Sequence, residues 1–450
     1  MLDFALMQLQ ERDKAVIWHP FTPLKQAPVP LPIVRGDGLY LIDEQGRRYM
    51  DAISSWWVNL HGHAHPYIAR KLYEQAMTLE QVIFAGFTHL PAIELAERLL
   101  PLLPGSFSKI FYSDNGSTST EVAIKMALQY WWNRSLHSDP PADASPSLKR
   151  TTILAFNNSY HGDTFGAMSV SDRSVFTMAF HDKLFDVLFI DTPSADNIVS
   201  LQQIIADKGQ NIAAFIYEPL VQGAGGMKMY DVRLLDQLIA AAKQQAIICI
   251  ADEVMTGFGR TGQLFASQHG QQQPDIICLS KGLTGGTMAL GVTAAAQFIV
   301  DAFVSDNALK TFFHGHSFTA NPLACAAALA SLDLLQQETC RRNIDQLVTF
   351  NANFAQRLRT LQPGLPIKNV RHLGTILAFE ITQGEDNYLN NLAATITARA
   401  MQKGLYIRPL GNTVYTMPPY CITLQELEWM ADTIIEIIQD IKTPPVVPMA

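Results

Sequence analysis

The sequence predicts an α/β fold in which a mostly parallel central sheet is flanked by helices and accompanied by a smaller α+β domain. Two observations lead to this prediction. Short apolar runs alternate with helical stretches between residues 109 and 296, and this repeated strand–helix–strand order implies right-handed crossovers and a parallel sheet. After a long helical region near residues 321–361 come shorter, mixed segments, which are typical of an α+β domain.

The elements of the sheet follow in order along the chain. A helix is expected at Glu121–Trp132, where Val122, Met126 and Tyr130 recur at helical spacing, and a second at Tyr230–Gln245. The expected strands are Lys109–Ser113, Thr152–Phe156, Val187–Ile190, Ala213–Tyr217, the apolar runs that end near residues 252 and 280, and Gly291–Ala296. The expected elements after residue 361 are Gly374–Ile381, Asn390–Lys403, Leu405–Arg408, Val414–Met417 and a helix near Leu424–Ile441. A proline- and serine-rich stretch, Ser138–Ser147, indicates a surface insertion.

The composition excludes several classes of protein. The formal net charge is −8 over 450 residues, without a basic stripe, so neither nucleic acid nor an anionic membrane is expected as a partner. No apolar stretch reaches the roughly 20 residues that span a bilayer. The first residues show neither a basic region nor a cleavage site, and the 5 cysteines form no Cys-x-x-Cys pair. These features favour a cytoplasmic enzyme that acts on small molecules.

Two charged residues stand at the ends of neighbouring apolar runs. Asp252 ends the first run and Lys281 ends the second. Ligands of parallel sheets gather at the carboxyl ends of the strands. A lysine there can form a Schiff base with an aldehyde, and a carboxylate can keep a ring nitrogen protonated, which are the two groups that pyridoxal phosphate needs. The alternative is that neither residue binds a cofactor: aspartate is common at strand ends, and most lysines are solvated surface charges.

The loop Asn115-Gly116-Ser117 adds a candidate anion site. It lies between an expected strand and an expected helix, where free N–H groups and the helix dipole attract a phosphate. Gly116 permits close approach, and Ser117 adds a hydroxyl donor. A simple helix cap is the alternative. Tyr160 follows the strand that ends at Phe156 and can stack on a pyridine ring, unless it is a core tyrosine.

Alternate histidines at His61, His63 and His65 have the spacing of a metal site on an extended segment. No carboxylate or cysteine partner is evident nearby, so we expect no metal.

These features together resemble a known family. Residues 250–262, with Asp252, and 274–286, with Lys281, are similar to the signature of the class III pyridoxal-phosphate aminotransferases. Within that family, Ser54-Ser-Trp56-Trp57 and Met417-Pro-Pro-Tyr420 resemble the members that transfer an amino group from adenosylmethionine to 8-amino-7-oxononanoate in biotin biosynthesis.

The resemblance implies a fold type I pyridoxal-phosphate transferase that is a homodimer with shared active sites. It implies an N-terminal segment, 1–65, that contributes to the small domain and the substrate pocket, a large cofactor-binding domain, 66–335, and a C-terminal small domain, 336–450. Lys281, Asp252 and Tyr160 are the implied catalytic residues. The implied cofactor-binding residues are Gly116, Ser117, Tyr160, Asp252 and Lys281, together with Gly315, His316 and Ser317 from the second subunit. The implied substrate-binding residues are Trp56, Trp57, Arg408, Tyr415, Gly315 and Phe21.

Two positions depart from the family pattern. Phe21 stands where a tyrosine is frequent, which removes a hydroxyl from the substrate pocket, and His316 stands where a proline is common. Arg260 and Glu218 lie in matching motifs, and an ion pair between them is one interpretation.

Three alternatives stay open. The amino donor can be lysine in place of adenosylmethionine. The chain can be another class III enzyme that uses a diamine, ornithine or an ω-amino acid. It can also be a non-catalytic protein on the same fold, although such a protein would be expected to lose Lys281 or Asp252.

Overall fold

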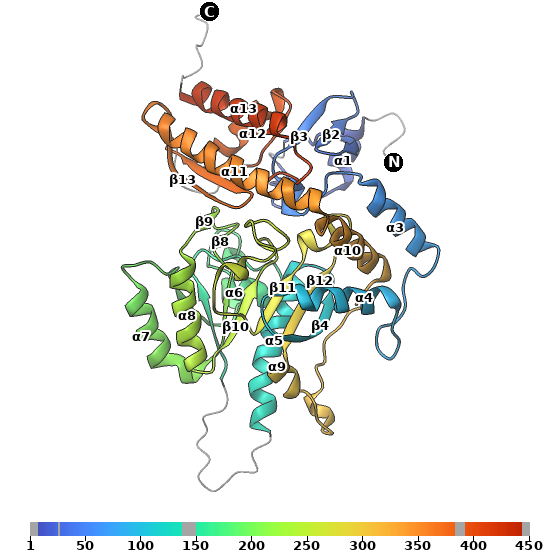
Figure 1. The fold of residues 1–450 in the computed structure, drawn as a ribbon, viewed down its shortest axis with the longest axis vertical. Helices are drawn as coiled ribbons and strands as arrows, with labels where there is room; N and C mark the ends of the chain where they lie inside the picture. Colours follow the sequence, from blue (N-terminus) through green and yellow to red (C-terminus); the bar gives the residue numbers. More distant parts are fainter. Residues whose placement is uncertain (1–7, 26–27, 137–149, 383–391, 443–450) are drawn as a thin grey trace, which may run out of the picture.

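The central sheet has seven strands in the order β4-β12-β11-β10-β7-β5-β6 (Figure 1). The computed structural model describes residues 8–25, 28–136, 150–382 and 392–442, so the predicted insertion at 138–147 lies outside the described residues. The strands are β4 Phe107–Ser113, β5 Thr152–Phe156, β6 Val187–Ile190, β7 Ile212–Tyr217, β10 Ile248–Asp252, β11 Ile276–Leu279 and β12 Gly291–Ala296. β12 pairs antiparallel with β11 and β4, and the other neighbours are parallel. The predicted mostly parallel sheet is confirmed.

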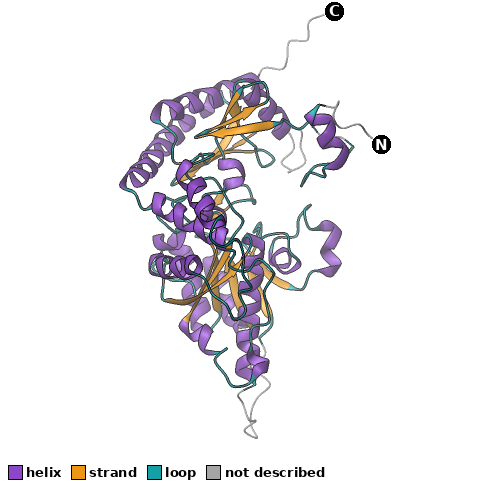
Figure 2. Cartoon of the chain, turned by 90° about the vertical axis from the view of Figure 1, so that its right-hand side faces the viewer, coloured by secondary structure: helices purple, strands orange, loops and turns teal. Residues whose placement is uncertain are grey.

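The strands are apolar throughout because both faces of the sheet are covered. Ile248 and Ile250 of β10 pack into one core cluster, which includes Trp131 of helix α5 (Gly116–Ser135). Cys249 and Ala251 point to the opposite cluster, where helix α8 (Val232–Gln244) packs. This alternation is the two-residue period of a strand, and a continuous apolar run is what a doubly covered parallel sheet requires. Figure 2 shows the strands between layers of helices.

The N-terminal and C-terminal segments form a second group of elements. One sheet has the order β1-β2-β3-β15 and another has the order β13-β14-β16, whereas β8 and β9 form a separate two-stranded sheet from the middle of the chain, between β7 and α8. The strands are β1 Ile33–Asp37, β2 Tyr40–Asp43, β3 Arg48–Asp51, β8 Val221–Gln222, β9 Lys228–Met229, β13 Ile367–Leu373, β14 Ile376–Ile381, β15 Leu405–Tyr406 and β16 Thr413–Thr416. β15 runs parallel to β3, with Leu405 opposite Met50, so segments far apart in sequence share one sheet. The exact domain boundaries at residues 65/66 and 335/336 stay a prediction.

The helices differ from the predicted ones mainly at their ends. α5 begins at Gly116, five residues earlier than expected, because Asn115 caps it by accepting a hydrogen bond from the Thr118 amide at 2.9 Å. The long region near 321–361 is two helices, separated where Gln337 adopts an extended conformation. The remaining helices are α1 Leu9–Val16, α2 Ser54–Trp57, α3 Pro66–Ala76, α4 Leu90–Leu99, α6 Phe165–Val170, α7 Ile198–Lys208, α9 Gln297–Asp301, α10 Pro322–Leu335, α11 Glu338–Leu361, α12 Leu392–Gln402 and α13 Leu424–Lys442.

Within the described part of the chain, no helix combines the length and the apolar character needed to cross a membrane. All five cysteines are free thiols, and four of them are buried. The cytoplasmic location stays a prediction.

Candidate active site

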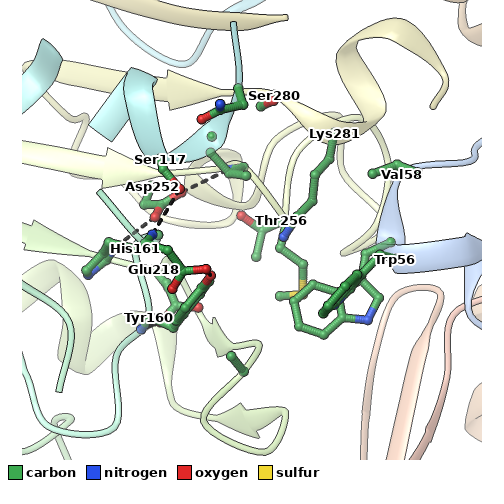
Figure 3. Close-up of a pocket in the computed structure, with 18 of the residues that line it drawn as sticks. Trp56, Val58, Ser117, Tyr160, His161, Glu218, Asp252, Thr256, Ser280 and Lys281 are labelled. Carbon is green, nitrogen blue, oxygen red and sulfur yellow. Dashed lines mark hydrogen bonds and ion pairs between the residues drawn. The ribbon is translucent and has the colours of Figure 1, made fainter. Parts of the chain in front are cut away.

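A cavity of about 540 Å³ lies where the carboxyl ends of β10 and β11 meet the first turn of α5 (Figure 3). Its volume falls in the ordinary range of ligand pockets, roughly 300–1,000 Å³. Ten of the predicted site residues line it: Phe21, Trp56, Trp57, Gly116, Ser117, Tyr160, Asp252, Lys281, Arg408 and Tyr415. The structure therefore brings together residues from the N-terminal segment, the central sheet and the C-terminal part.

Gly315, His316 and Ser317 are the predicted site residues that do not line this cavity. Their segment is tied to a different part of the same chain, because the Gln81 side chain donates a hydrogen bond to the Ser317 carbonyl at 2.7 Å. The backbone amide of His316 donates to Thr319 Oγ1 at 3.0 Å, a bond that proline could not make. The histidine is thus accommodated by a local turn.

Asp252 ends β10 with its carboxylate fixed at both oxygens. Oδ1 accepts a hydrogen bond from the Val254 amide at 3.0 Å, and Oδ2 lies 2.7 Å from His161 Nδ1. His161 is itself buried, and its Nε2 has no hydrogen-bond partner. The pair forms a rigid acidic group at the floor of the cavity, visible in Figure 3 on the side opposite Lys281.

Lys281 stands two residues after the end of β11, facing the same cavity. Burial lowers the pKa of its amine from 10.5 to about 8, against the opposing effects of the Asp252 and Glu218 charges. Nζ lies 4.4 Å from the centroid of the Trp57 ring. Its backbone φ is +42°, in the left-handed region that residues other than glycine rarely adopt. A partly neutral amine held in a strained position is typical of a reactive lysine.

The first turn of α5 is packed tightly against the loop after Asp252. A Cβ atom on Gly116 would lie 2.7 Å from Val254 Cγ1, so only glycine fits there. The Gly116 and Ser117 amides stand in the first turn, before the helix's own hydrogen bonds begin, and point along the positive end of the helix dipole. Ser117 Oγ also accepts a hydrogen bond from the Asp163 amide at 3.1 Å. This turn can bind a phosphate group.

Tyr160 is held in the loop after β5 by two contacts. Its amide donates to Glu218 Oε2 at 3.1 Å, and its hydroxyl donates to Asp163 Oδ2 at 2.9 Å. Burial, and then the negative charge of Asp163, raises the pKa of the Tyr160 phenol well above its ordinary value, so the ring stays neutral. Burial also raises the pKa of Glu218 to about 7.

An aromatic wall covers the side of the cavity away from the sheet. Trp57 Nε1 donates to the Tyr415 hydroxyl at 2.8 Å. The Arg408 guanidinium carbon lies 5.0 Å from the Trp56 ring centroid, a cation–π contact. Phe21 packs its ring edge-to-face with Trp56 at 5.6 Å. This wall offers apolar surface for an aliphatic chain and one fixed cation.

Arg260 and Glu218 do not form the ion pair that was one interpretation of the sequence. Arg260 is 1% exposed and donates to four backbone carbonyls, those of Trp57 and Asn59 in one segment and of Met417 and Pro418 in another. Glu218 accepts from backbone amides instead. Arg260 therefore joins the two sequence motifs that the resemblance connects with the substrate.

Two of the three alternate histidines have side-chain hydrogen-bond partners of their own, and the ring of the third, His65, lies edge-on to that of His61 at 6.3 Å. His61 contacts Ser331 at 3.0 Å, and burial lowers the pKa of its ring to about 3. His63 contacts Asp51 at 2.9 Å, a carboxylate partner that the sequence did not indicate.

Comparison with known proteins agrees with this geometry. The model of the family described as aminotransferase class-III matches residues 21–438. The chain is 46% identical to the adenosylmethionine-8-amino-7-oxononanoate aminotransferase of Synechococcus elongatus, over 94% of this chain and 99% of that protein. The enzyme of that name from Helicobacter pylori is 36% identical, over 96% of this chain and 97% of that protein.

This chain belongs to the class III aminotransferases.

Solved structures support the same fold. The crystal structure of the adenosylmethionine-8-amino-7-oxononanoate aminotransferase from Methanocaldococcus jannaschii matches with a TM-score of 0.89 and 33% identity, over 96% of this chain and 98% of that one. An omega transaminase from Pseudomonas jessenii in complex with PMP matches with a TM-score of 0.87 and 27% identity, over 96% and 98%. Class III aminotransferases are pyridoxal-phosphate enzymes of fold type I, as the sequence predicted.

Several residues that line the cavity were not predicted from the sequence, and two of them, His161 and Phe176, contact predicted site residues. His161 stands beside Tyr160 in a motif that was recognised, but nothing in the spacing indicated its contact with Asp252. Phe176 also lines the cavity, with its ring 5.7 Å from that of Phe21. It lies in an irregular loop, and no sequence pattern pointed to it.

Proposed function

We propose that this protein transfers the amino group of adenosylmethionine to 8-amino-7-oxononanoate, giving 7,8-diaminononanoate for biotin biosynthesis. The observation that carries the proposal is a single cavity in which Lys281 and Asp252 face an aromatic wall and the guanidinium of Arg408. Relatives that match nearly the whole chain are named for this reaction.

The residues present fit pyridoxal 5′-phosphate. Lys281 offers an amine with a lowered pKa, and Asp252 offers a carboxylate held by His161. The first turn of α5 offers free backbone amides. It can pack closely against Val254 because Gly116 has no Cβ atom. When bound, the cofactor supplies an aldehyde that accepts the amino group and a ring that takes up electron density from the carbon bearing that group.

Each residue has a distinct task in this proposal. Lys281 would hold the cofactor through its aldehyde, and its amine would move the proton at the substrate carbon. Asp252 keeps the ring nitrogen protonated, because a fixed carboxylate in a buried site favours the positive charge. Tyr160 covers the ring, and Gly116 and Ser117 hold the phosphate with their amides.

Arg408 binds the substrate carboxylate through its planar guanidinium fork. Trp56 and Trp57 cover the aliphatic chain of the acceptor and favour the sulfonium cation of the donor by cation–π attraction. Both substrates use the same pocket in turn, so the kinetics are ping-pong.

A homodimer with shared sites completes the proposal. Gly315, His316 and Ser317 stand outside the cavity of their own chain, and the neighbouring Phe313 and Phe318 are exposed. We infer that this loop serves the partner's cavity. Mixing Lys281→Ala chains with Ser317→Asp chains should restore partial activity, whereas verified heterodimers without activity would count against shared sites.

The assay that tests the function supplies 8-amino-7-oxononanoate with adenosylmethionine and, separately, with lysine. We expect diaminononanoate with adenosylmethionine. Formation of diaminononanoate with lysine but not with adenosylmethionine would identify lysine as the amino donor. Good turnover of ornithine or 4-aminobutyrate, with no diaminononanoate from either donor, would establish another class III activity.

A further inference from the structure

The four-residue element α2, Ser54–Trp57, carries the two tryptophans and is interrupted by non-helical angles, so it is better described as a turn with an uncommon backbone conformation. Ser54, Ser55 and Trp57 have φ angles of 54°, 60° and 68°. Side chains with a Cβ atom rarely occupy this left-handed region. Three such residues in one short turn persist only where the surrounding structure fixes them, and such turns cluster at ligand sites.

Asp51, at the end of β3, fixes this turn directly. Its carboxylate is 0% exposed, and its two oxygens accept from the turn's own backbone: Oδ1 from the Ile53 amide at 3.1 Å and Oδ2 from the Ser55 amide at 2.6 Å. The Ser55 amide belongs to the segment with the left-handed angles, and the Ile53 amide stands directly before it. A charged acceptor that holds two amides at once is a strong restraint on their orientation.

His63 closes over the same carboxylate from another segment. Its Nε2 lies 2.9 Å from Asp51 Oδ2, and its Nδ1 lies 3.2 Å from Asn59 Nδ2. Its backbone is anchored on the β1–β2 turn, because its amide donates to the Gly38 carbonyl at 2.7 Å. The ring therefore bridges the Asp51 carboxylate and the Asn59 amide. The Asp51 carboxylate thus holds the turn, and His63 in turn holds the Asp51 carboxylate.

The two tryptophans depend on this arrangement to different extents. Trp57 has further anchors, through the Tyr415 hydroxyl and through Arg260, which donates to its carbonyl. Trp56 is 42% exposed and rests on Phe21 and on the Arg408 guanidinium. Loosening the turn should therefore move Trp56 much more than Trp57.

The position of Trp56 matters because it stands between two cavities. The main cavity and a second one of about 410 Å³ share Trp56, Arg408 and Tyr415 as lining residues. The second cavity is otherwise lined by largely apolar residues of the N-terminal sheet and α12, among them Leu41 and Met401. A displaced Trp56 would join the two spaces and remove the wall from the substrate chain.

We propose that Asp51 and His63 are positioning residues that fix Trp56 between the two cavities and thereby set substrate affinity. The proposal deepens the proposed function and rests on it. Neither side chain lines the main cavity, and their contacts with the turn leave Lys281, Asp252 and His161 untouched. The expected signature is a raised KM for both substrates with kcat nearly preserved.

The test compares Asp51→Asn with Asp43→Asn. Asp43 is 1% exposed on the neighbouring strand and holds a different turn, through the Gln45 and Arg47 amides. Asp51 accepts one backbone hydrogen bond at each oxygen, whereas Asp43 accepts both of its backbone bonds at Oδ1 and the Arg47 and Tyr49 side chains at Oδ2, so both variants remove a buried negative charge from a hydrogen-bonded turn. We expect Asp51→Asn to raise KM by roughly tenfold, the ratio that a single lost charge-assisted hydrogen bond produces. Asp43→Asn should lower the melting temperature and leave KM unchanged. Equal KM effects in both variants would overturn the proposal.

His63 provides a second and milder perturbation. His63→Ala should raise KM, and His63→Gln, whose amide can donate to Asp51, should recover part of the loss. Equal KM values in the two variants, both at the wild-type level, would exclude a positioning role for His63.

A structural readout separates this proposal from the proposed function. Acrylamide quenching of tryptophan fluorescence in the cofactor-loaded protein should rise in Asp51→Asn but not in Asp43→Asn, and the rise should vanish when Trp56→Phe is added. Unchanged quenching would refute the positioning of Trp56. Failure of the wild-type protein to form diaminononanoate would refute the function and leave the quenching result standing.

Discussion

The two ends of the active-site cavity are built by different means. At the cofactor end, Asp252 ends β10 and Lys281 follows the adjacent parallel strand β11, and the first turn of α5 lies beside them. At the substrate end, Phe21, Trp56 and Arg408 come from turns and loops of segments distant in sequence. The first end is anchored on the hydrogen bonds of a sheet, with a left-handed φ at Lys281 itself, and the second is held by aromatic contacts and by the left-handed turn at Ser54–Trp57.

This difference predicts a division of labour in kinetics. Groups placed by the sheet face the reacting atoms, so their loss should appear in kcat. Groups placed by the aromatic wall face the remainder of the substrate, so their loss should appear mainly in KM.

The largest effect is expected for Lys281→Ala, at the cofactor end. Loss of the amine removes both the covalent attachment and the proton carrier, so turnover should fall by more than about a thousandfold. Circular dichroism should show an unchanged fold. Borohydride reduction of the wild-type protein with its cofactor, followed by peptide mapping, should label Lys281. A label on a different lysine would contradict the assignment.

Asp252→Asn should reduce kcat by about a hundredfold or more, because an amide of the same shape cannot hold the ring nitrogen protonated. Cofactor occupancy, measured by absorbance, should fall much less. His161→Gln, which keeps one donor beside Asp252, should have a smaller effect. Wild-type turnover in Asp252→Asn would show that the carboxylate has another role.

Glu218 lines the cavity and should make the stability of the protein depend on pH. Burial raises its pKa from 4.5 to about 7, so between these values the folded protein binds more protons than the unfolded chain. The free energy of unfolding contributed by Glu218 therefore falls as the pH rises through this window, by up to roughly 3 kcal/mol. In cofactor-free protein, Glu218→Gln should lose this part of the slope. Identical pH profiles for variant and wild type would contradict the raised pKa.

Arg408→Ala should raise KM for 8-amino-7-oxononanoate by more than the tenfold that about 1.4 kcal/mol represents, with the cofactor spectrum unchanged. Arg408→Lys is the matched control, because it keeps the charge and loses the planar fork. If the Arg408→Lys variant keeps the full affinity for 8-amino-7-oxononanoate, a positive charge alone is sufficient and the bidentate geometry is not required.

The same contrast explains what the sequence could predict. The sequence predicted that Asp252, Lys281 and Gly116 lie close together, because parallel topology brings strand ends together and a loop between strand and helix has free amides, and these residues line one cavity. The partners of Arg260, the contact of His161 with Asp252 and the presence of Phe176 could not be predicted. They depend on loops whose conformation is set by tertiary packing and not by a local pattern.

The smallest effect should come from restoring a hydroxyl to the aromatic wall. Phe21 packs against Trp56 and Phe176 and lines the cavity, where a tyrosine would add one polar contact. A single neutral hydrogen bond contributes about 0.5–1.5 kcal/mol, so Phe21→Tyr should lower KM for one of the two substrates by at most about tenfold. The effect should be confined to KM, because residue 21 belongs to the substrate end, where its ring contacts are with Trp56 and Phe176. Phe176→Tyr is the control, since it adds the same hydroxyl to the same aromatic cluster at another point. A change in kcat with unchanged KM in Phe21→Tyr would contradict the separation of the two ends, because a group on the aromatic wall would then act on the chemistry itself.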